Sequence, residues 1–566
     1  MVILDLTKDG FLGSNISNKL NNLALRERKN FTNIIGKISI PLKNNIDWWV
    51  SNPASRNTLN SDLFLSYCKI RLVKEILESG KNIDKIIVET PEMKFILSRL
   101  QNIKGTLIVL DKSIILTRII NTISFTLTIG KQFLYRLFQI TLFRILYFGR
   151  NIIPAQPITL IDTFALPGYY SKDRYYNGLW ESLNSAEKKS LYFIPIIVMT
   201  KLNEFSKAYK ELFSAERQFI FREAYIKITD IVYALLHFIR VRFIKIKSIM
   251  IEGIDYSPLI ISELHRKGGY SLAIEGLINY KFIKRLKQRG IELIKVIDWW
   301  EGQALDKGLQ LALKKYYPNT PTIGYLGYAP RELELQLYPA DYELNNNVVP
   351  EKIAVIGKGY IESLKILNPL QNIECAPAFR YNHLWDQNLQ EPQLDKYTVL
   401  IALPIVFEAS IHILKLFNSC LNEIKTNKLR VLVKPHPAIP IQRLKDYFGA
   451  DWPHNYEDYN VITKKALREA DILISGMSSI CMEAMALGIP VIVIKQLNGL
   501  EFIPIPGNIP NILWKLCGNK NSIIKSIDYF KNREESEIQS HRILGQEILE
   551  TYFEPVSRKA VIKFLK

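Results

Sequence analysis

Short apolar runs alternate with helical patterns along most of this chain, and this alternation limits the fold more than any other feature. In the second half, the apolar runs lie at residues 397–403, 429–434, 471–475 and 490–495, with segments of helical period between them. Short, almost continuous apolar runs are typical of strands that are buried on both faces. Because strands that alternate with helices form βαβ units around a parallel sheet, we expect an α/β fold with two Rossmann-like domains.

The composition of one segment predicts the division into domains. Residues 366–396 are rich in proline, asparagine and glutamine, which is typical of a linker. We therefore expect an N-terminal domain over residues 1–365 and a C-terminal domain over residues 397–566. A basic apolar insertion at about residues 112–155 interrupts the strand pattern of the first domain, and we expect it to be helical.

Basic residues clearly outnumber acidic ones. The 566 residues include 74 Lys plus Arg and 55 Asp plus Glu, which leaves a formal net charge of +19. A hydrophobic fraction of 48% and a charged fraction of 23% are ordinary for a globular protein, and they exclude a disordered or collagen-like chain. The charge predicts an anionic partner, which is a nucleic acid, a membrane surface or a phosphorylated substrate.

The insertion contains no acidic residue between Lys112 and Leu160. On a helix Gln132, Arg136 and Gln139 would share one face, and apolar residues would cover most of the remainder. This pattern is typical of an interfacial helix whose apolar side enters lipid while its basic residues meet anionic headgroups. The alternative is a helix buried in a large domain with its arginines at the rim. We expect an anionic membrane surface as a partner.

Other features concern the compartment. No segment is long and apolar enough for a transmembrane helix, and the N-terminus lacks the basic and apolar regions of a signal peptide. The cysteines are scattered and form no CxxC pair, which favours reduced thiols. We expect a cytoplasmic protein that is peripheral on the inner face of the cytoplasmic membrane. The cysteines are Cys68, Cys375, Cys420, Cys481 and Cys517.

The strongest local motif follows the apolar run that ends at Ser475. A turn of small residues comes next, with Gly476, Ser478 and Ser479, and a helix is expected to begin at the paired serines. Hydroxyls and free backbone N–H groups at a helix N-terminus hold a phosphate without a metal. Glu483 lies about one turn further along and is a candidate ligand of a ribose hydroxyl. Alternatively, the serines only cap the helix and Glu483 is solvated.

A second motif, Lys434-Pro435-His436-Pro437, follows the run at 429–434. A parallel strand delivers Lys434 and His436 to its carboxyl end, where doubly wound sheets bind ligands. The prolines, Pro437 among them, restrict the backbone around the histidine. A cationic or N–H-donating group in this place stabilises the charge that builds up on a leaving phosphate. Two such motifs about one βα unit apart predict a phosphate site more specifically than either motif alone.

The two motifs resemble the HP and Ser-Ser motifs of bacterial surface-polysaccharide glycosyltransferases with the GT-B architecture. These include the sialyltransferase, Kdo-transferase and capsule-synthesis groups that use CMP-activated sugars, and a related pattern occurs in the polyol-phosphate polymerases of teichoic acid synthesis. The resemblance implies two Rossmann-like domains that face a cleft. It also implies that His436, Ser478 and Ser479 bind the donor phosphate. Residues 299–303 and 321–325 are similar to a "WxEGQ … TIGY" stretch of surface-carbohydrate synthesis proteins, as are residues 47–57.

The N-terminal domain of such an enzyme is expected to bind the acceptor and to supply a carboxylate. An inverting transferase needs a base for the acceptor hydroxyl, whereas a retaining one can use a carboxylate nucleophile. Glu301, at the end of a predicted strand, is the first candidate, and Asp255 is the second. Asp298 and Glu252 occupy similar positions, and each carboxylate has a capping or salt-bridge role as its alternative. The adjacent Trp299 belongs either to the core or to a sugar-stacking surface.

Several familiar motifs are missing from the sequence. It has no GxGxxG after the first strand, no GxxxxGK[ST] and no DxD, and its seven histidines form no ligand cluster. The basic residues also lack the aromatic pattern of RNA-binding modules, so nucleic acid is the least expected partner. We expect no metal and no cofactor beyond a nucleotide-sugar co-substrate.

We therefore predict a metal-independent GT-B glycosyltransferase. Its donor is expected to be a CMP-activated nonulosonic or Kdo-type acid, and its acceptor a glycan or a lipid-linked glycan. The enzymatic alternatives are transfer of a polyol phosphate from a CDP-polyol and transfer of a hexose from a UDP- or GDP-sugar. The non-enzymatic alternative is a membrane-associated subunit of polysaccharide assembly with a vestigial donor site.

Overall fold

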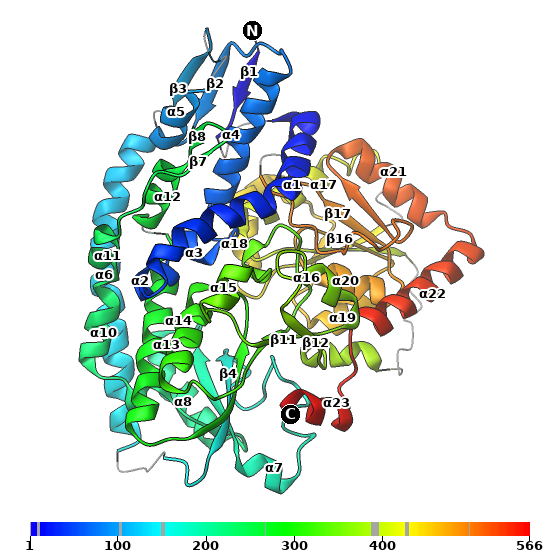
Figure 1. Cartoon of the computed structure of the whole chain (residues 1–566). Helices are drawn as coiled ribbons and strands as arrows, with labels where there is room; N and C mark the ends of the chain where they lie inside the picture. The colour runs from blue at the N-terminus through cyan, green and yellow to red at the C-terminus, as the bar shows by residue number, and fades with distance from the viewer. Residues whose placement is uncertain are drawn as a thin grey trace.

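Parallel strands form three sheets in the computed structural model, as far as its described residues extend (Figure 1). The structure describes residues 2–7, 12–100, 103, 105–111, 113–148, 153–266, 268–386, 396–424, 429–496 and 499–566, with the backbone alone for 113–124 and 126.

The C-terminal sheet has the strand order β15-β14-β13-β16-β17-β18, and all neighbours are parallel. In chain order this is 3-2-1-4-5-6, the order of a doubly wound Rossmann sheet. The order reverses between β13 and β16, and sheets of this type bind ligands beyond the carboxyl ends of the strands at that point. The strands are β13 (Tyr397–Ala402), β14 (Leu429–Lys434), β15 (Tyr456–Asp458), β16 (Ile472–Ser475), β17 (Val491–Ile494) and β18 (Trp514–Cys517).

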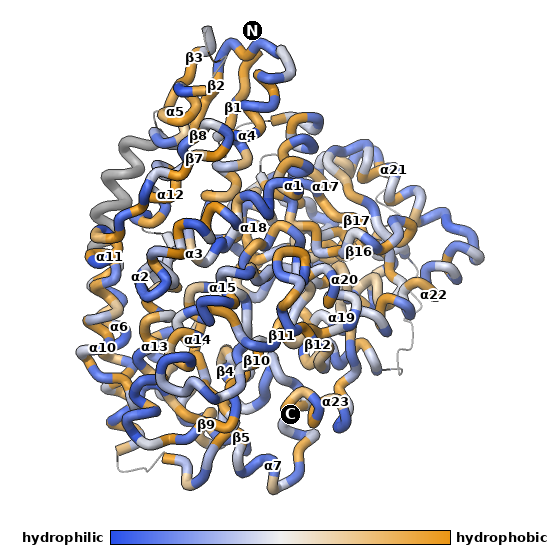
Figure 2. The backbone as a smooth tube through the Cα atoms, viewed as in Figure 1, coloured by the Kyte–Doolittle hydropathy of each residue, from blue (hydrophilic) through white to orange (hydrophobic). Residues whose placement is uncertain are grey.

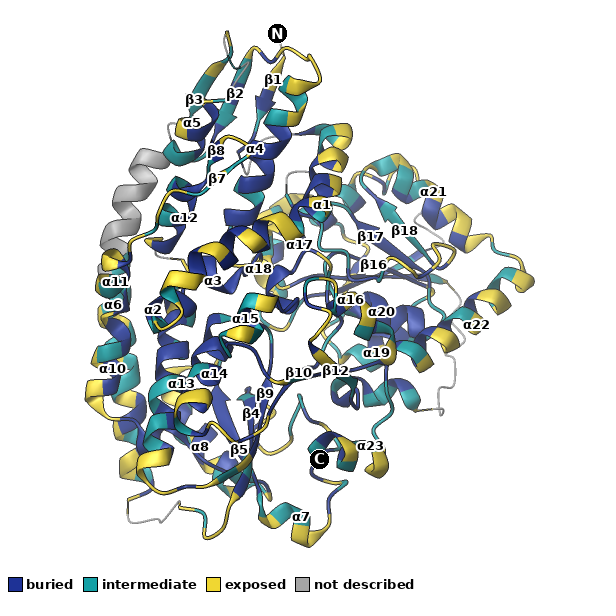
Figure 3. Ribbon diagram, in the orientation of Figure 1, coloured by how far each residue is buried: buried dark blue, intermediate teal, exposed yellow. Residues whose placement is uncertain are grey.

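The second large sheet has the order β12-β11-β10-β9-β4-β5-β6. Numbered from β4, it also begins 3-2-1-4, with its reversal between β4 and β9. The predicted α/β fold with two Rossmann-like domains is therefore confirmed, and both sheets lie largely buried between helices (Figure 3). The strands are β4 (Ile158–Ala165), β5 (Leu191–Ile197), β6 (Gln218–Phe219), β9 (Leu293–Trp299), β10 (Thr322–Leu326), β11 (Lys352–Val355) and β12 (Asn372–Cys375).

The first part of the chain forms a lobe of its own rather than joining the second sheet. Its three-stranded sheet has the order β1-β2-β3, and α1 (Gly13–Ser39) and α4 (Leu63–Glu78) pack together beside it. Rings on these helices meet in a separate core, with the Phe31 and Phe64 centroids 5.0 Å apart. The single N-terminal domain that we expected over residues 1–365 therefore contains two α/β units. The strands are β1 (Ile3–Asp5), β2 (Lys85–Val88) and β3 (Leu107–Leu110).

One long helix, α6 (Ser113–Leu146), runs along an edge of the molecule between the lobe and the second sheet (Figure 1). Its 34 residues span about 50 Å. A helix was expected over this insertion and is present, although Lys112 and residues 149–152 lie outside the described residues. Among the helices that are described, none is long and apolar enough to cross a membrane.

The face of α6 that carries Arg136 is turned inward, contrary to our prediction that it meets lipid headgroups. Arg136 forms an ion pair with Glu275 of α13 (Tyr270–Gln288), and Gln139 is buried. Burial, together with nearby Arg222, lowers the pKa of Arg136 to about 10. Only the expected direction of this face was wrong, because the partner that makes burial of this arginine tolerable lies on a helix far away in sequence. The membrane partner stays a prediction.

The boundaries of the C-terminal region also differ from the predicted ones. The expected linker, 366–396, contains the edge strand β12 and the short helix η6 (Phe379–Trp385), while its residues 387–395 lie outside the described residues. At the end of the chain, α23 (Arg558–Leu565) returns to the second sheet, where Lys295 Nζ donates to the Leu565 carbonyl at 2.9 Å. The last helix therefore contacts the sheet of the N-terminal domain.

Candidate active site at the junction of the two large sheets

His436 lies two residues beyond the end of β14 and is partly buried. Its Nδ1 accepts a hydrogen bond from the Ala438 amide at 3.1 Å, so the neutral ring carries its proton on Nε2. Burial lowers the pKa of the imidazole, and the cations Arg174, Lys434 and Arg380 lower it further, to about 4. At neutral pH this histidine is an uncharged N–H donor rather than a cation or a base.

The other members of the same motif are held differently. Lys434 is buried, and its Nζ donates to the Val461 carbonyl at 2.5 Å. Burial and Arg174 lower the pKa of its ammonium group. Pro437 is exposed beside the histidine. The lysine therefore adds positive charge beneath the site, while its hydrogen-bonding capacity is partly used by the backbone.

The serine motif forms a turn between β16 and α20 (Ile480–Ala486). The Ser478 amide donates to the Gly476 carbonyl at 2.9 Å, and Ser479 occupies the N-cap position without a capping bond from its own hydroxyl. Ser478 and Ser479 are both partly exposed. Their hydroxyls thus remain near the position where the strand order of the six-stranded sheet reverses.

Residues that follow strands of the seven-stranded sheet lie against this turn. Arg331 Nη1 donates to the Met477 carbonyl at 2.6 Å. The Tyr381 hydroxyl faces the Ser479 side chain without reaching hydrogen-bond geometry. Because both contacts come from segments that follow strands of the seven-stranded sheet, the serine turn lies at the junction of the two sheets.

Glu483 is buried and faces η6 rather than open solvent. Its Oε2 lies 3.1 Å from His383 Nε2, at ion-pair distance but without hydrogen-bond alignment. The predicted contact between Glu483 and a ribose hydroxyl thus stays a prediction, and in this structure the carboxylate contacts His383.

Glu301 follows β9 by two residues, as His436 follows β14. Its Oε1 accepts from Trp299 Nε1 at 2.9 Å, and its Oε2 accepts from Gln303 Nε2 at 2.5 Å. Burial raises the pKa of this carboxyl group. Trp299 itself is buried, with a ring that meets Tyr175 edge-on at 4.5 Å, so it forms the wall that supports Glu301.

The loop that carries Glu301 has a rigid backbone. Asp306 Oδ2, at the start of α14 (Ala304–Tyr316), accepts from the amides of Glu301 at 3.0 Å and Gln303 at 2.8 Å. Gly302 between them has φ +66°, and a Cβ atom at this position would lie 1.9 Å from the Gln336 carbonyl oxygen. Only glycine fits here, which explains the glycine of the Glu-Gly-Gln stretch.

Two arginines that our sequence interpretation missed connect the halves of the site. Arg380, on η6, lies within electrostatic reach of Glu301, Glu483 and His436. Its guanidinium lies 5.5 Å from the Tyr175 ring centroid, and no hydrogen bond or ion pair to it is found among the described residues. Burial opposes its charge, but the surrounding tyrosines and carboxylates raise the pKa of Arg380 above its usual value.

Arg174 lies in the loop after β4 and lowers the pKa of both His436 and Lys434. The neighbouring Asp173 fixes this loop, because its Oδ2 contacts Arg217 Nη1 at 2.6 Å and its Oδ1 accepts from the Tyr175 amide at 2.7 Å. Nothing in the sequence around Arg174 or Arg380 indicated a site, since each reaches His436 only through the packing of the two sheets.

Asp255, the second predicted catalytic carboxylate, does not join this group. It belongs to the hairpin of β7 (Met250–Ile251) and β8 (Ile254–Asp255) beside the N-terminal lobe. Its Oδ1 accepts from the Ser257 amide at 2.9 Å at the start of α12 (Ser257–Leu264). Its rival Asp298 is fully buried within β9, and Glu252 pairs with Arg71. Of these four carboxylates, Glu301 is the one within electrostatic reach of both Arg380, which also acts on His436, and Arg331, which bonds the serine turn.

Comparisons with known proteins find solved structures of low identity to this chain. No family model matches the sequence, and a comparison with curated proteins finds no match. Solved structures that resemble the chain include S. aureus MnaA with UDP, at 11% identity and a TM-score of 0.41, covering 72% of this chain and 95% of that chain. A putative UDP-N-acetylglucosamine 2-epimerase from Listeria monocytogenes has 14% identity and a TM-score of 0.42, with the same coverages.

The wall teichoic acid polymerase TagF is also similar in structure. Its identity to this chain is 11% and its TM-score 0.37, and the match covers 79% of this chain and 96% of that chain. Identities and scores this low do not establish an activity. The fold itself is established by the strand orders of the two large sheets.

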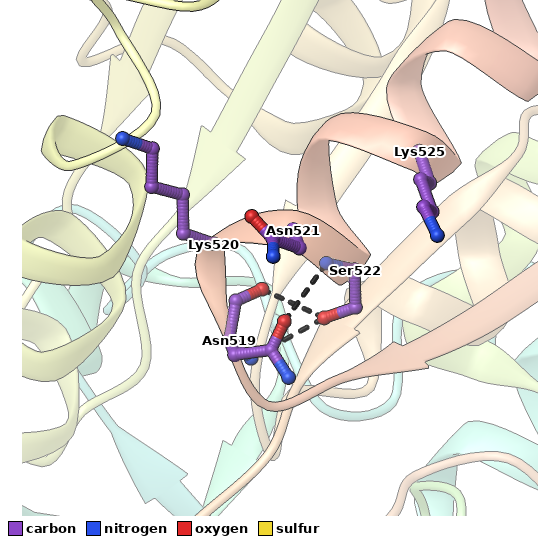
Figure 4. A pocket seen from close by; sticks show the side chains of 5 residues that line it. All are labelled: Asn519, Lys520, Asn521, Ser522 and Lys525. Atoms are coloured by element: carbon purple, nitrogen blue, oxygen red, sulfur yellow. Dashed lines mark hydrogen bonds between the residues drawn. The ribbon is translucent and has the colours of Figure 1, made fainter.

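A separate depression of about 440 Å³ lies at the start of α21 (Lys520–Lys531). Figure 4 shows Asn519 and Ser522 bonded to each other there, while Lys520 and Lys525 extend away on different sides. Lys520 pairs with Glu423. The hydrogen bonds between Asn519 and Ser522 are those of a helix N-cap. We therefore assign these polar groups to the cap of α21 and no ligand site to the depression.

Proposed function

We propose that this chain is a glycosyltransferase of the GT-B type that uses a nucleotide-activated sugar. In this proposal the donor phosphate binds between the His436 Nε2–H, the Ser478 and Ser479 hydroxyls, and the two arginines from the opposite domain. The acceptor binds on the side of the seven-stranded sheet, with its reacting hydroxyl near Glu301.

One observation carries the proposal: the Arg380 guanidinium lies 5.9 Å from the ring centroid of Trp299, which bonds Glu301, and it is within electrostatic reach of both Glu301 and His436. A carboxylate, a neutral N–H donor and a guanidinium with no bonded partner among the described residues thus lie beyond the carboxyl ends of strands from both Rossmann sheets. Group transfer to a hydroxyl needs a proton acceptor on one side and stabilisation of a leaving phosphate on the other.

The chemistry follows from these positions. The acceptor oxygen attacks the anomeric carbon, and the bond from that carbon to the phosphate oxygen breaks, so the nucleotide leaves with the electron pair. In an inverting reaction Glu301 takes the proton of the acceptor hydroxyl, and its raised pKa makes it a stronger base than an exposed glutamate. His436 and the arginines offset the charge on the leaving phosphate. Glu301 as a nucleophile in a retaining reaction is the alternative for this residue.

The donor that we propose first is a CMP-activated nonulosonic or Kdo-type acid, because the paired HP and Ser-Ser motifs resemble those of transferases that use such donors. A diphosphate donor, such as a CDP-polyol or a UDP- or GDP-sugar, is the second candidate. The number of cations favours it, since Arg174, Arg380 and Lys434 together supply more charge than one phosphate requires.

The acceptor in this proposal is a glycan or a lipid-linked glycan of a bacterial surface polysaccharide, and the enzyme works peripherally on the inner face of the cytoplasmic membrane. The enzyme is proposed to be independent of metals.

Isothermal titration with CMP, CDP, UDP and GDP tests the donor. We expect CMP or CDP to bind, and the His436→Ala variant to bind more weakly by about tenfold, because it loses a hydrogen bond to a charged group. His454→Ala, an exposed histidine of the same domain, serves as the matched control. Binding of UDP but not of CMP or CDP would contradict the cytidine donor, and failure of all four nucleotides would contradict the donor site.

The non-enzymatic alternative makes a different prediction for the same variant. A polysaccharide-assembly subunit with a vestigial site would keep full nucleotide affinity and full polymer synthesis after His436→Ala. Measurement of polymer in cells that carry only this variant separates the two views.

A further inference from the structure

The outer side of α6 is apolar. Five large apolar side chains of α6 and the two residues that follow it are exposed, and the steps of seven, four, seven and three between them place them on one face of a helix. Isolated exposed apolar residues are common on protein surfaces, but an aligned row of them is not. The row consists of Leu127 (70% exposed), Leu134 (64%), Phe138 (42%), Ile145 (70%) and Phe148 (92%).

A second exposed apolar row lies on α10 (Ile228–Leu235), α11 (His237–Arg240) and η3 (Val241–Phe243). Its members are again spaced by three or four residues, as on one helical face. The row consists of Ile228, Val232, Leu236, Ile239 and Phe243, of which Phe243 is 77% exposed.

The helical segments that carry the two rows lie side by side. Arg144, near the end of α6, donates to the Ile226 carbonyl just before α10 at 2.9 Å, and Phe125 meets Phe238 edge-on with ring centroids 5.8 Å apart. The helices therefore run antiparallel along one edge of the molecule, as Figure 1 shows, and Figure 2 shows apolar residues along both. We call the surface of the two rows the edge face.

The charge of the edge face is entirely basic over its described residues. Neither α6 nor the segment 226–251 exposes an acidic side chain, because Asp230 is buried and paired with Arg285. The acid that faces α6 from α13, Glu275, is bonded to Arg136 and Arg222. The exposed basic residues between or beside the rows are Lys131, Arg144, Lys227, Arg242, Lys245 and Lys247.

A recess of about 200 Å³ lies at the end of the edge face where the two helices meet. Phe125 and Phe238 form part of its wall, and the exposed Arg242 contributes to its lining. An anionic group that approaches this end of the face meets aromatic surface and the Arg242 guanidinium, while Glu263 of the same lining is buried and paired with Arg266.

We propose that the edge face lies on a bilayer that contains anionic lipids, with both apolar rows in the headgroup region and the lysines and arginines on lipid phosphates. This inference gives a surface to the membrane association in the proposed function, on which it rests. It reverses the orientation expected from the sequence, because Arg136 holds the helix to the protein and the apolar row faces lipid. Apolar rows flanked by cations are the composition of interfacial helices.

A second copy of the chain is a poorer occupant of the same surface. A symmetric dimer through the edge face would place its lysines and arginines opposite those of the other copy, without exposed acids on this face to pair with them. Anionic lipid supplies the missing negative charge.

Vesicle co-sedimentation tests the proposal. The probes are vesicles of phosphatidylcholine alone and vesicles of phosphatidylcholine and phosphatidylglycerol in equal parts. The full chain is expected to bind the anionic vesicles and not the neutral ones. The combined change Leu134→Gln, Phe138→Gln and Ile145→Gln should weaken binding by about tenfold or more, and Lys245→Gln with Lys247→Gln should weaken it mainly at low salt.

Matched controls are Leu370→Gln and Ile462→Gln, which are exposed apolar residues on other elements, 84% and 66% exposed. Both should leave vesicle binding unchanged. Nucleotide titration should give the wild-type affinity for every one of these variants, so that loss of membrane binding is distinguishable from loss of the donor site. Equal binding to both kinds of vesicle, no binding to either, or unchanged binding by the triple variant would overturn the proposal. So would a dimer that the triple change dissociates in light scattering.

Discussion

The two large sheets share the Rossmann strand order, and in both the position of a polar residue relative to the strand end decides what it does. Within the strands such residues are used by the protein itself. Asp298 of β9 is fully buried, and Lys434, the last residue of β14, donates a hydrogen bond to a backbone carbonyl. Two residues beyond the strand ends, Glu301 and His436 face the junction. The comparison teaches that the sheet determines the location of a site, while the first residues of the loops supply its chemistry.

The largest effect is expected at Glu301. Glu301→Gln removes the proposed base and should lower the rate of sugar transfer by about 10²–10⁴-fold, with nucleotide affinity unchanged. Asp298→Asn, in the adjoining strand, should change the rate little, because burial raises the pKa of Asp298 and an amide resembles a protonated carboxyl group. Both variants are assayed by their initial rates of sugar transfer. Equal losses of rate would contradict the proposed difference in role between the strand carboxylate and the loop carboxylate.

The next effect concerns the rigidity of the Glu301 loop. Gly302→Ala places a Cβ atom against the Gln336 carbonyl at φ +66° and should destabilise the fold by about 2 kcal/mol or more. Gly130→Ala, in α6 with open space around it, should be neutral or stabilising by up to about 1 kcal/mol. Denaturant unfolding gives both values. A stable Gly302→Ala protein with normal transfer would show that the loop adapts.

The third prediction concerns Arg380, which follows a strand of the seven-stranded sheet and acts electrostatically on His436 of the six-stranded sheet. Arg380→Gln should weaken nucleotide binding by about tenfold, as a charged hydrogen bond to phosphate is lost. It should also lower the transfer rate, as should His436→Ala, because both groups offset the charge on the leaving phosphate. Arg289→Gln, an exposed arginine at the end of α13, is the control. Titration and initial rates separate these effects, and wild-type affinity for Arg380→Gln would place the phosphate elsewhere.

The smallest effect is a pH dependence at His436. Its pKa is about 4 in the folded chain against an ordinary value of 6.5, so below pH 6.5 the unfolded chain binds a proton that the folded chain does not. Its contribution to stability is therefore complete above pH 6.5 and declines as the pH falls toward 4. The His436→Asn variant should lose less stability than the wild type over this interval.

Nitrogen NMR of the labelled histidine checks the same point directly. The spectrum should show the neutral Nε2–H form at pH 6, because Nδ1 accepts the Ala438 amide. A doubly protonated ring at that pH would mean that His436 acts through its charge.

The sequence alone located four strands of the six-stranded sheet, β13, β14, β16 and β17, because short apolar runs between helical patterns have few other solutions. It did not locate β12, which lies within the expected linker. It also located His436, the serine turn and Glu301, since residues that follow a strand end can be identified by counting along the chain. Sequence patterns could not separate the N-terminal lobe from the second sheet, because both use the same βαβ alternation.

Only the tertiary structure decided which of these residues meet and which surface is free. Arg174 and Arg380 reach His436 across the junction of the two sheets, and Asp255 belongs to a different part of the molecule. The orientation of α6 depended on Glu275, a partner on a helix far along the chain. The helical period of a sequence shows which residues share a face. Whether that face points into the protein or toward solvent depends on long-range contacts that pair its buried charges.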